Sequence, residues 1–457
     1  MEKRDVVVYS EDYKKLVDAT ALKDKYYEID ERVEEICKEA FKGCDKLEEI
    51  VMPKKLKKID SEAFQGCSSL TKLTLPSRVA SIGRWAFYGC SGLTELTLPD
   101  TLECIEAFAF CGCSGLTELT LPNRVRIIEV SAFEGCSGLT ELTLPNSVVR
   151  IDGLAFGGCS GLEKITVESG NSRYDSRDNC NSIIDKKTNT LIAGCKNSVI
   201  PNSVARIDGL AFCGCSGLTE LTLPNSVKSI GDGAFAYCSG LTKLTLPNIL
   251  INIWESAFEG CSGLTELTLP NSVKSIGRYA FQGCSGLTEL TLPNSVKSIG
   301  DGAFAYCSGL TELTLPNSVV RIDGLAFGGC SGLTELTLPN SVKSIGDRAF
   351  AYCSGLTELT LPNSVTSIGN CAFGGCSGLT ELTLPNSITS IGDYAFAYCS
   401  DLSKITSLAE IPPMCGFKVF NGVNKTNCEL IVPEGSVAAY TRAEDWNKFS
   451  NIRGFSK

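Results

Sequence analysis

The sequence of 457 residues contains no histidine. This absence excludes Ser–His–Asp and Cys–His catalytic arrangements, histidine metal ligands and histidine proton shuttles. The chain also lacks a Walker A loop, a strand-linked dinucleotide-binding glycine loop, a G-x-S-x-G elbow and an H-E-x-x-H zinc motif. We therefore expect a protein without enzymatic activity, cofactor or metal.

Long apolar runs are also missing. No window approaches the roughly 18 apolar residues that a membrane-spanning helix requires. The N-terminal stretch MEKRDVVVYSEDYKKLVDAT has an apolar run of only three residues, Val6 to Val8, so it lacks the form of a signal peptide. Taken alone, these features favour a reducing cytoplasm in which the 24 cysteines stay free thiols.

Positive charge is in deficit, since 42 Lys and Arg face 52 Asp and Glu and give a net charge of −10. General nucleic-acid binding requires a basic face, so we do not expect a nucleic-acid partner. The balance suits a protein in aqueous solution that has basic or cationic partners.

A cysteine returns every 23 residues along most of the chain. It ends the pattern A-F-x-x-C and is followed by L-x-x-L-x-L-P. After Cys159 a gap of 56 residues equals one repeat of 23 plus an insertion of 33, and the series then resumes. The column consists of Cys44, Cys67, Cys90, Cys113, Cys136, Cys159, Cys215, Cys238, Cys261, Cys284, Cys307, Cys330, Cys353, Cys376 and Cys399.

Each position of the repeat has a structural interpretation. The alternation in T-E-L-T-L predicts a short strand with leucines inward and Glu and Thr outward, and the following proline ends it. V-x-x-I predicts a second inward-facing stretch, A-F-x-x-C a tight helical or 3₁₀ turn, and Ser-Gly a corner. One coil cannot bury these apolar faces, whereas stacked coils bury them continuously, as in a solenoid.

The pattern L-x-x-L-x-L-P-x-x-V-x-x-I-x-x-x-A-F-x-x-C resembles the BspA-like class of leucine-rich repeats over roughly residues 27–457. That class occurs in surface proteins of bacteria, especially host-associated anaerobes, and in some parasitic protists. The resemblance implies a leucine-rich repeat solenoid, mostly β with short 3₁₀ or helical turns, whose 23-residue repeats stack into a curved rod with capped ends. It also implies a secreted or cell-surface location. Family members commonly carry an export signal, however, and the N-terminal stretch given above does not have the form of one.

Five segments are expected along the chain. Strands at Ser182–Asp185 and Thr190–Ala193 are expected inside the insertion, where the sequence resembles a hairpin variation of the same class. The segments are an N-terminal cap at 1–26, repeats at 27–167, an irregular β-hairpin insertion at 168–200, repeats at 201–405 and a C-terminal cap at 406–457.

The cysteine column is interpreted as packing. Zinc sites need short C-x₂₋₄-C pairs, which a 23-residue period does not supply. Stacked thiols point the same way instead of facing one another, and no histidine is present to act as a base. A free cysteine is a small residue that is often buried, and it fits a tight corner.

Chemistry elsewhere in the chain stays open. Cys180 with Cys195, and Cys415 with Cys428, are candidate disulfides if the protein is exported. The C-x-C pairs at Cys111 and Cys213 lack further metal ligands. Asp175 and Asp178 in the insertion offer oxygen ligands without EF-hand spacing.

An outward-facing stripe of Glu and Thr is the candidate binding surface. If the stripe is functional, its negative charge attracts a basic or extended partner. The alternative is that outward positions of a sheet simply need polar residues, and that duplication of the repeat copied the same ones into each coil. Lys72, Lys164, Lys243 and Lys404 interrupt the glutamates. The candidate residues are Glu95, Glu118, Glu141, Glu220, Glu266, Glu289, Glu312, Glu335, Glu358 and Glu381, with Thr268, Thr291, Thr314 and Thr337.

The sequence therefore predicts a non-catalytic, protein-binding leucine-rich repeat protein. The resemblance adds adhesion, through recognition of a host, matrix or cell-surface protein by the solenoid surface. The alternative is an intracellular scaffold or structural rod without an adhesive role.

Overall fold

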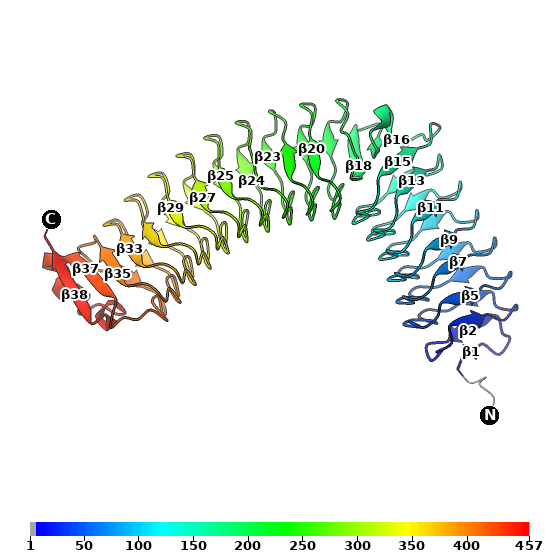
Figure 1. Cartoon of the computed structure of the whole chain (residues 1–457), viewed down its shortest axis with the longest axis horizontal. Coiled ribbons are helices and arrows are strands. Elements are labelled where there is room, and N and C mark those ends of the chain that lie inside the picture. Colours follow the sequence, from blue (N-terminus) through cyan, green and yellow to red (C-terminus); the bar gives the residue numbers. More distant parts are fainter. Residues whose placement is uncertain (1–5, 457) are drawn as a thin grey trace. The chain divides into compact units, whose positions relative to one another are not determined.

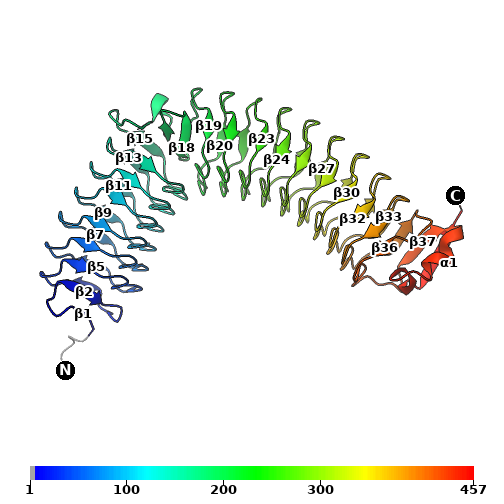
Figure 2. The ribbon, with the colours of Figure 1, turned by 180° about the vertical axis from the view of Figure 1, so that it is seen from behind.

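The computed structural model describes residues 6–456 and divides into two compact units, Met1–Thr219 and Glu220–Lys457 (Figure 1). Residues 1–5 of the expected N-terminal cap lie outside the described residues. In each unit, successive coils stack on one another, and Figure 2 shows the same stacks from behind. The leucine-rich repeat solenoid is confirmed, with many strands and very little helix. Between residues 6 and 456, no helix has the length and apolarity to cross a membrane.

The first unit carries two kinds of strand. The longer strands form one face of each coil: β3 (Tyr26–Glu28), β5 (Glu49–Val51), β7 (Lys72–Thr74), β9 (Glu95–Thr97), β11 (Glu118–Thr120), β13 (Glu141–Leu144) and β15 (Lys164–Val167). The shorter strands form the other: β4 (Glu35–Ile36), β6 (Lys58–Ile59), β8 (Ser81–Ile82), β10 (Cys104–Ile105), β12 (Ile127–Ile128), β14 (Arg150–Ile151) and β19 (Arg206–Ile207). At the N-terminal end, β1 (Val8–Tyr9) pairs antiparallel with β2 (Lys15–Asp18).

The second unit repeats this organisation. Its longer strands are β20 (Glu220–Thr222), β22 (Lys243–Thr245), β25 (Glu289–Thr291), β27 (Glu312–Thr314), β29 (Glu335–Thr337), β31 (Glu358–Thr360), β33 (Glu381–Leu384), β35 (Lys404–Ser407), β37 (Glu429–Pro433) and β38 (Asn451–Phe455). Its shorter strands are β21 (Ser229–Ile230), β23 (Asn252–Ile253), β24 (Ser275–Ile276), β26 (Ser298–Ile299), β28 (Arg321–Ile322), β30 (Ser344–Ile345), β32 (Ser367–Ile368), β34 (Ser390–Ile391) and β36 (Met414–Cys415).

Neighbouring coils pair in parallel, with each residue beside its own copy 23 positions further along. Leu290 of β25 lies beside Leu313 of β27, and Glu289 lies beside Glu312. In these strands the leucine is buried and the flanking Glu and Thr are exposed, which confirms the alternation predicted from T-E-L-T-L. Every outward position of the repeat therefore becomes a column on the surface.

The phenylalanine of A-F-x-x-C forms a stack in the core of each unit. In the second unit, ring centroids from Phe235 to Phe396 are 5.3–5.5 Å apart and successive planes lie within 9°. Aromatic pairs add about 0.5–1.5 kcal/mol beyond the burial of their area. The stack holds each coil at a fixed height above its neighbour.

The A-F-x-x-C segment consists of consecutive turns, not of a continuous 3₁₀ helix. Gly328 N–H donates to the Leu325 carbonyl within the coil, at 2.9 Å. Leu325 N–H and Phe327 N–H donate to the carbonyls of Asp347 and Ala349 in the next coil, both at 2.9 Å. The positive φ of Leu325, 56°, interrupts the helical path. The corner is thus hydrogen-bonded both within and between coils.

The insertion forms a small antiparallel ladder in the first unit. β16 (Tyr174–Asp175), β17 (Ser182–Asp185) and β18 (Thr190–Gly194) pair in that order, so the two strands expected from the sequence are present. The short helix η1 (Arg177–Asn179) connects β16 to β17. Buried Asp185 accepts hydrogen bonds from Arg173 Nε at 2.7 Å and from Lys187 N–H at 2.8 Å.

An aromatic cluster lies at the C-terminal end of the second unit. The chain here forms η2 (Glu434–Ser436), α1 (Val437–Tyr440) and η3 (Trp446–Lys448). Trp446 Nε1 donates to the Pro413 carbonyl at 2.9 Å, and the Tyr440 and Ser407 hydroxyls are 2.7 Å apart. The Trp446 ring also lies 5.2 Å from Phe420, so this cluster covers the last ring of the core.

The phenylalanine stack predicts a large local effect of truncation. Replacing Phe327 by Ala removes two ring contacts and leaves a cavity, so we expect the free energy of unfolding to fall by about 3–5 kcal/mol. Urea denaturation followed by circular dichroism measures this change. Glu335→Gln, at an exposed position, serves as the control and should stay within about 0.5 kcal/mol of wild type. A Phe327→Ala protein as stable as wild type would contradict the role of the stack.

Candidate functional site

The candidate stripe lies on the longer strands, except at Glu266 and Thr268, where Thr268 forms only an isolated bridge to Thr291. Each Glu and Thr lies on either side of an inward-facing leucine, so the pleat of the strand directs both outward. All ten glutamates and the four threonines are exposed. The structure brings them together as columns within each unit: Glu95, Glu118 and Glu141 in the first, and the other seven glutamates in the second.

Three of the ten glutamates form ion pairs where the column meets a lysine. Glu95 lies 2.6 Å from Lys72 Nζ, and Glu141 lies 3.3 Å from Lys164 Nζ. At the C-terminal end, Glu381 lies 2.9 Å from Lys404 Nζ. The hydrogen bond that Lys404 Nζ donates to the Glu381 carboxylate raises the pKa of Lys404 above its ordinary value. These three glutamates are locally neutralised, a distinction that the repeat pattern alone does not reveal.

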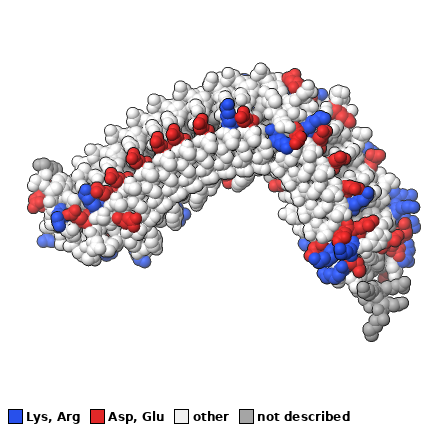
Figure 3. All heavy atoms as spheres, in the orientation of Figure 1, with Lys and Arg blue, Asp and Glu red and all other residues white. Residues whose placement is uncertain are grey.

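Five successive glutamates of the second unit make no ion pair anywhere in the described residues. We call Glu266, Glu289, Glu312, Glu335 and Glu358 the acidic row. Figure 3 shows it as a line of red atoms along the face of the second unit, with blue atoms at its two ends. Strands of one sheet lie about 4.8 Å apart, so like charges are closely opposed along the row.

The threonine column runs beside the acidic row. Within residues 6–456, the hydroxyls of Thr268, Thr291, Thr314 and Thr337 have no hydrogen-bond partner inside the chain. Their backbones do pair: Thr291 lies beside Thr314, and Thr314 beside Thr337. The face therefore offers a partner a column of carboxylates beside a parallel column of hydroxyl groups.

A polar hollow of about 590 Å³ lies at the N-terminal end of the row, a feature that sequence reasoning missed. Glu220, Lys243 and Glu266 line it together with neighbouring threonines. β22 pairs with β20, whereas the next sheet begins only at the bridge between Thr268 and Thr291, so the ladder is broken here. The signal in the sequence is the departure of NILINIWES from the repeat NSVKSIGDG.

The cysteine column has a bonding role in addition to packing. In most coils the buried thiol donates to the phenylalanine carbonyl 26 residues earlier, as Cys330 does to Phe304 at 3.3 Å and Cys284 to Phe258 at 3.3 Å. Burial raises the pKa of Cys90 to about 12, and that of Cys330 lies well above its ordinary value. These thiols stay protonated and hold neighbouring coils together.

The other sequence candidates do not combine into a chemical site. All 24 cysteines are free thiols. The two candidate disulfides, Cys180 with Cys195 and Cys415 with Cys428, are therefore not formed in this structure. Asp175 is held by Arg177 Nε at 2.8 Å. Across residues 6–456, no three Cys, Asp or Glu side chains gather closely enough to hold a metal ion.

Comparison with known proteins relates the chain to one family. The model of the BspA type leucine rich repeat region matches residues 21–114, 81–187, 182–311 and 297–423. A leucine rich cell surface protein from Faecalibacterium prausnitzii is 32% identical over 67% of this chain and 85% of its own, with a TM-score of 0.57. A leucine-rich repeat protein from Bacteroides ovatus is 26% identical over 100% and 97%, with a TM-score of 0.53. No curated protein matches the chain.

The buried thiols predict a loss of stability in alkali. Their folded pKa lies above the ordinary value of 9.0, so the unfolded chain releases protons first as the pH rises. Stability is then fully present below pH 9 and falls between pH 9 and about 12, by about 1.4 kcal/mol per pH unit for each such thiol. Urea denaturation at pH 8, 9 and 10 measures this slope. A free energy of unfolding that is constant over this range would show that the thiols are not buried as described.

The acidic row predicts that its charges do not stabilise the fold. Changing Glu289, Glu312, Glu335 and Glu358 together to Gln should leave the melting temperature unchanged or raise it by a few degrees at low salt, because it removes repulsion. Half-molar salt should abolish the difference, since it screens exposed charges.

Glu381→Gln is the matched control, because it removes an ion pair and so should give no increase. A fourfold variant that melts well below wild type would mean that the row serves the fold itself.

Proposed function

The chain belongs to the BspA-type leucine-rich repeat family, and from this premise we propose a non-catalytic, protein-binding role at the cell surface. The acidic row and its threonine column form the binding face in this proposal. The partner is a basic or extended protein segment of a host, matrix or cell-surface protein. The similarity to the leucine rich cell surface protein of Faecalibacterium prausnitzii supports the location.

One observation carries the proposal: five successive glutamates are exposed and unpaired, whereas Glu95, Glu141 and Glu381, at the same repeat position, pair with lysines. A run of opposed like charges is unfavourable for the isolated chain. A cationic partner relieves that repulsion and is attracted before contact, because aligned charges of one sign raise its local concentration.

The reactive groups of the chain support a role without catalysis. Nucleophilic cysteine needs a thiolate, and burial keeps the thiols of the column protonated. The sequence supplies no histidine to act as a base. The outward surface of the second unit offers carboxylates, hydroxyls and lysines instead, which are groups suited to recognition.

The free thiols favour a second candidate, an intracellular scaffold without an adhesive role. A protein kept in a reducing compartment retains its 24 cysteines as thiols. Antibody labelling of intact and of permeabilised source cells separates the two locations. Labelling only after permeabilisation would remove the cell-surface part of the proposal.

The binding face is tested with a fluorescent oligolysine peptide as the cationic probe. We expect wild type to bind it at low salt and half-molar salt to weaken binding, because the contacts are exposed ion pairs. The variant with Gln at Glu289, Glu312, Glu335 and Glu358 should bind about tenfold more weakly.

The matched control changes Glu95, Glu118, Glu141 and Glu381 to Gln, which removes the same charge outside the row. Fluorescence anisotropy measures each affinity. Equal weakening by both variants would show that net charge attracts the peptide and that the row has no special part.

A further inference from the structure

A second charged row lies on the shorter strands of the second unit. Lys228, Lys274, Lys297 and Lys343 occupy one repeat position, directly before β21, β24, β26 and β30. All four are exposed, and none has a carboxylate within 4.0 Å among the described residues. We call these four lysines the basic row.

The acidic row and the basic row lie at different strands of each coil. In one coil, Leu313 of β27 and Ile322 of β28 both point into the shared core. The strands that carry Glu289, Glu312, Glu335 and Glu358 form one sheet, whereas the shorter strands that follow the lysines of the basic row belong to other sheets. Among residues 6–456, the ion pairs of the second unit join other residues, such as Lys404 with Glu381.

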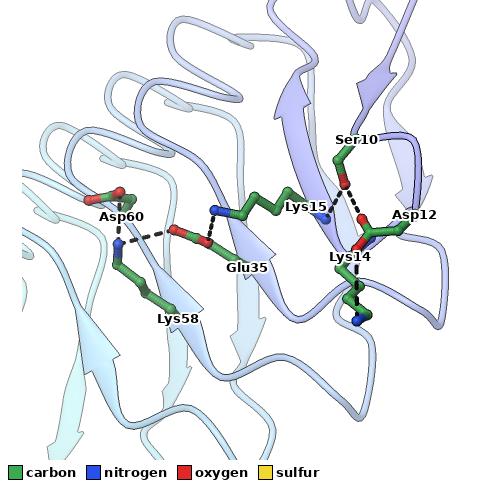
Figure 4. A network of polar contacts seen from close by, with 7 residues as sticks. All are labelled: Ser10, Asp12, Lys14, Lys15, Glu35, Lys58 and Asp60. Carbon is green, nitrogen blue, oxygen red and sulfur yellow. Dashed lines mark hydrogen bonds and ion pairs between the residues drawn. The ribbon is translucent and has the colours of Figure 1, made fainter.

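The first unit shows how this chain neutralises charge on the same face. Figure 4 shows Lys15, Glu35, Lys58 and Asp60 in a continuous network. Lys15 Nζ lies 2.8 Å from Glu35, and Lys58 Nζ lies 3.1 Å from Glu35 and 3.0 Å from Asp60. Because positive and negative side chains alternate there, the charges on that face neutralise one another within the molecule. The basic row of the second unit carries only one sign and has no such network.

Both rows inherit their spacing from the same coils. Coils advance by 5.3–5.5 Å per step at the phenylalanine stack, and each row takes one position from each coil that contributes to it. Lys274, Lys297 and Lys343 come from the coils that contain Glu266, Glu289 and Glu335. The number of coils between these lysines therefore equals the number between these glutamates on a second copy, so one register places three lysines opposite three glutamates.

We propose that the second unit binds a second copy of this chain, with the acidic row of one molecule against the basic row of the next. The occupant is the chain itself because it carries the complementary charge at the matching period. Such an interface joins two different faces, which leaves one row free at each end of the assembly. Association therefore continues beyond a dimer and depends strongly on salt. The acidic row is shared with the proposed function, but self-association does not require any other partner.

Sedimentation velocity of the full chain tests this directly. We expect wild type to form a concentration-dependent series of oligomers at low salt and to sediment as a monomer in half-molar salt. The variant K274E/K297E/K343E has two acidic faces, and E266K/E289K/E335K carries lysine at the three matching positions of the acidic row. Each alone should associate at least about tenfold more weakly than wild type, and mixing them should restore the oligomers.

Asp401→Lys with Glu444→Lys is the control, since it changes exposed charges outside both rows and should leave association unchanged. A wild-type monomer at low salt and about 100 μM would overturn the proposal. Swapped variants that still associate alone, or that fail to associate when mixed, would overturn it as well. Failure of the proposed function is distinguishable, because oligolysine binding by the neutral variant K274Q/K297Q/K343Q, which creates no second acidic face, reports on the acidic row separately.

Discussion

In-register stacking of near-identical coils is the constraint on which the rest of this structure depends. Leu290 lies beside Leu313, and Phe304 lies 5.5 Å from Phe327, because each is the 23-residue copy of the other. The thiol of Cys330 and the N–H of Phe327 add hydrogen bonds between coils at the corner. A substitution at a core position therefore affects contacts with the coils on both sides.

In-register stacking also aligns charged residues, and there it destabilises the fold instead of stabilising it. An apolar residue repeated in register gains a matching neighbour, whereas a repeated carboxylate gains a like charge. The shorter strands at the N-terminal end of the first unit avoid this cost through alternation, as in Lys15, Glu35 and Lys58. The acidic and basic rows of the second unit have no such pairing, and we propose that a second molecule neutralises them. Marginal stability makes such a cost significant, so surfaces that bear it are candidates for binding.

Much of the fold could be predicted from the sequence because the repeat encodes it directly. The alternation around Leu313 fixed which residues face outward, and Pro316 marked the end of the strand. The site was less predictable, because pairing depends on which coil follows. Glu381 is neutralised by Lys404 and Glu358 is not, although both occupy the same repeat position. The break after β22 and the bond from the Cys330 thiol depend on local backbone geometry that a residue pattern does not contain.

The central claim is that the unpaired rows of the second unit are contact surfaces between molecules. Zero-length carbodiimide cross-linking of a mixture of ¹⁴N- and ¹⁵N-labelled chains at low salt measures this most directly, because it joins only carboxylates and amines in contact. The account predicts mixed-isotope cross-links from Glu266, Glu289 and Glu335 to Lys274, Lys297 and Lys343. Cross-links found only within single chains, such as Glu381 to Lys404, would contradict it.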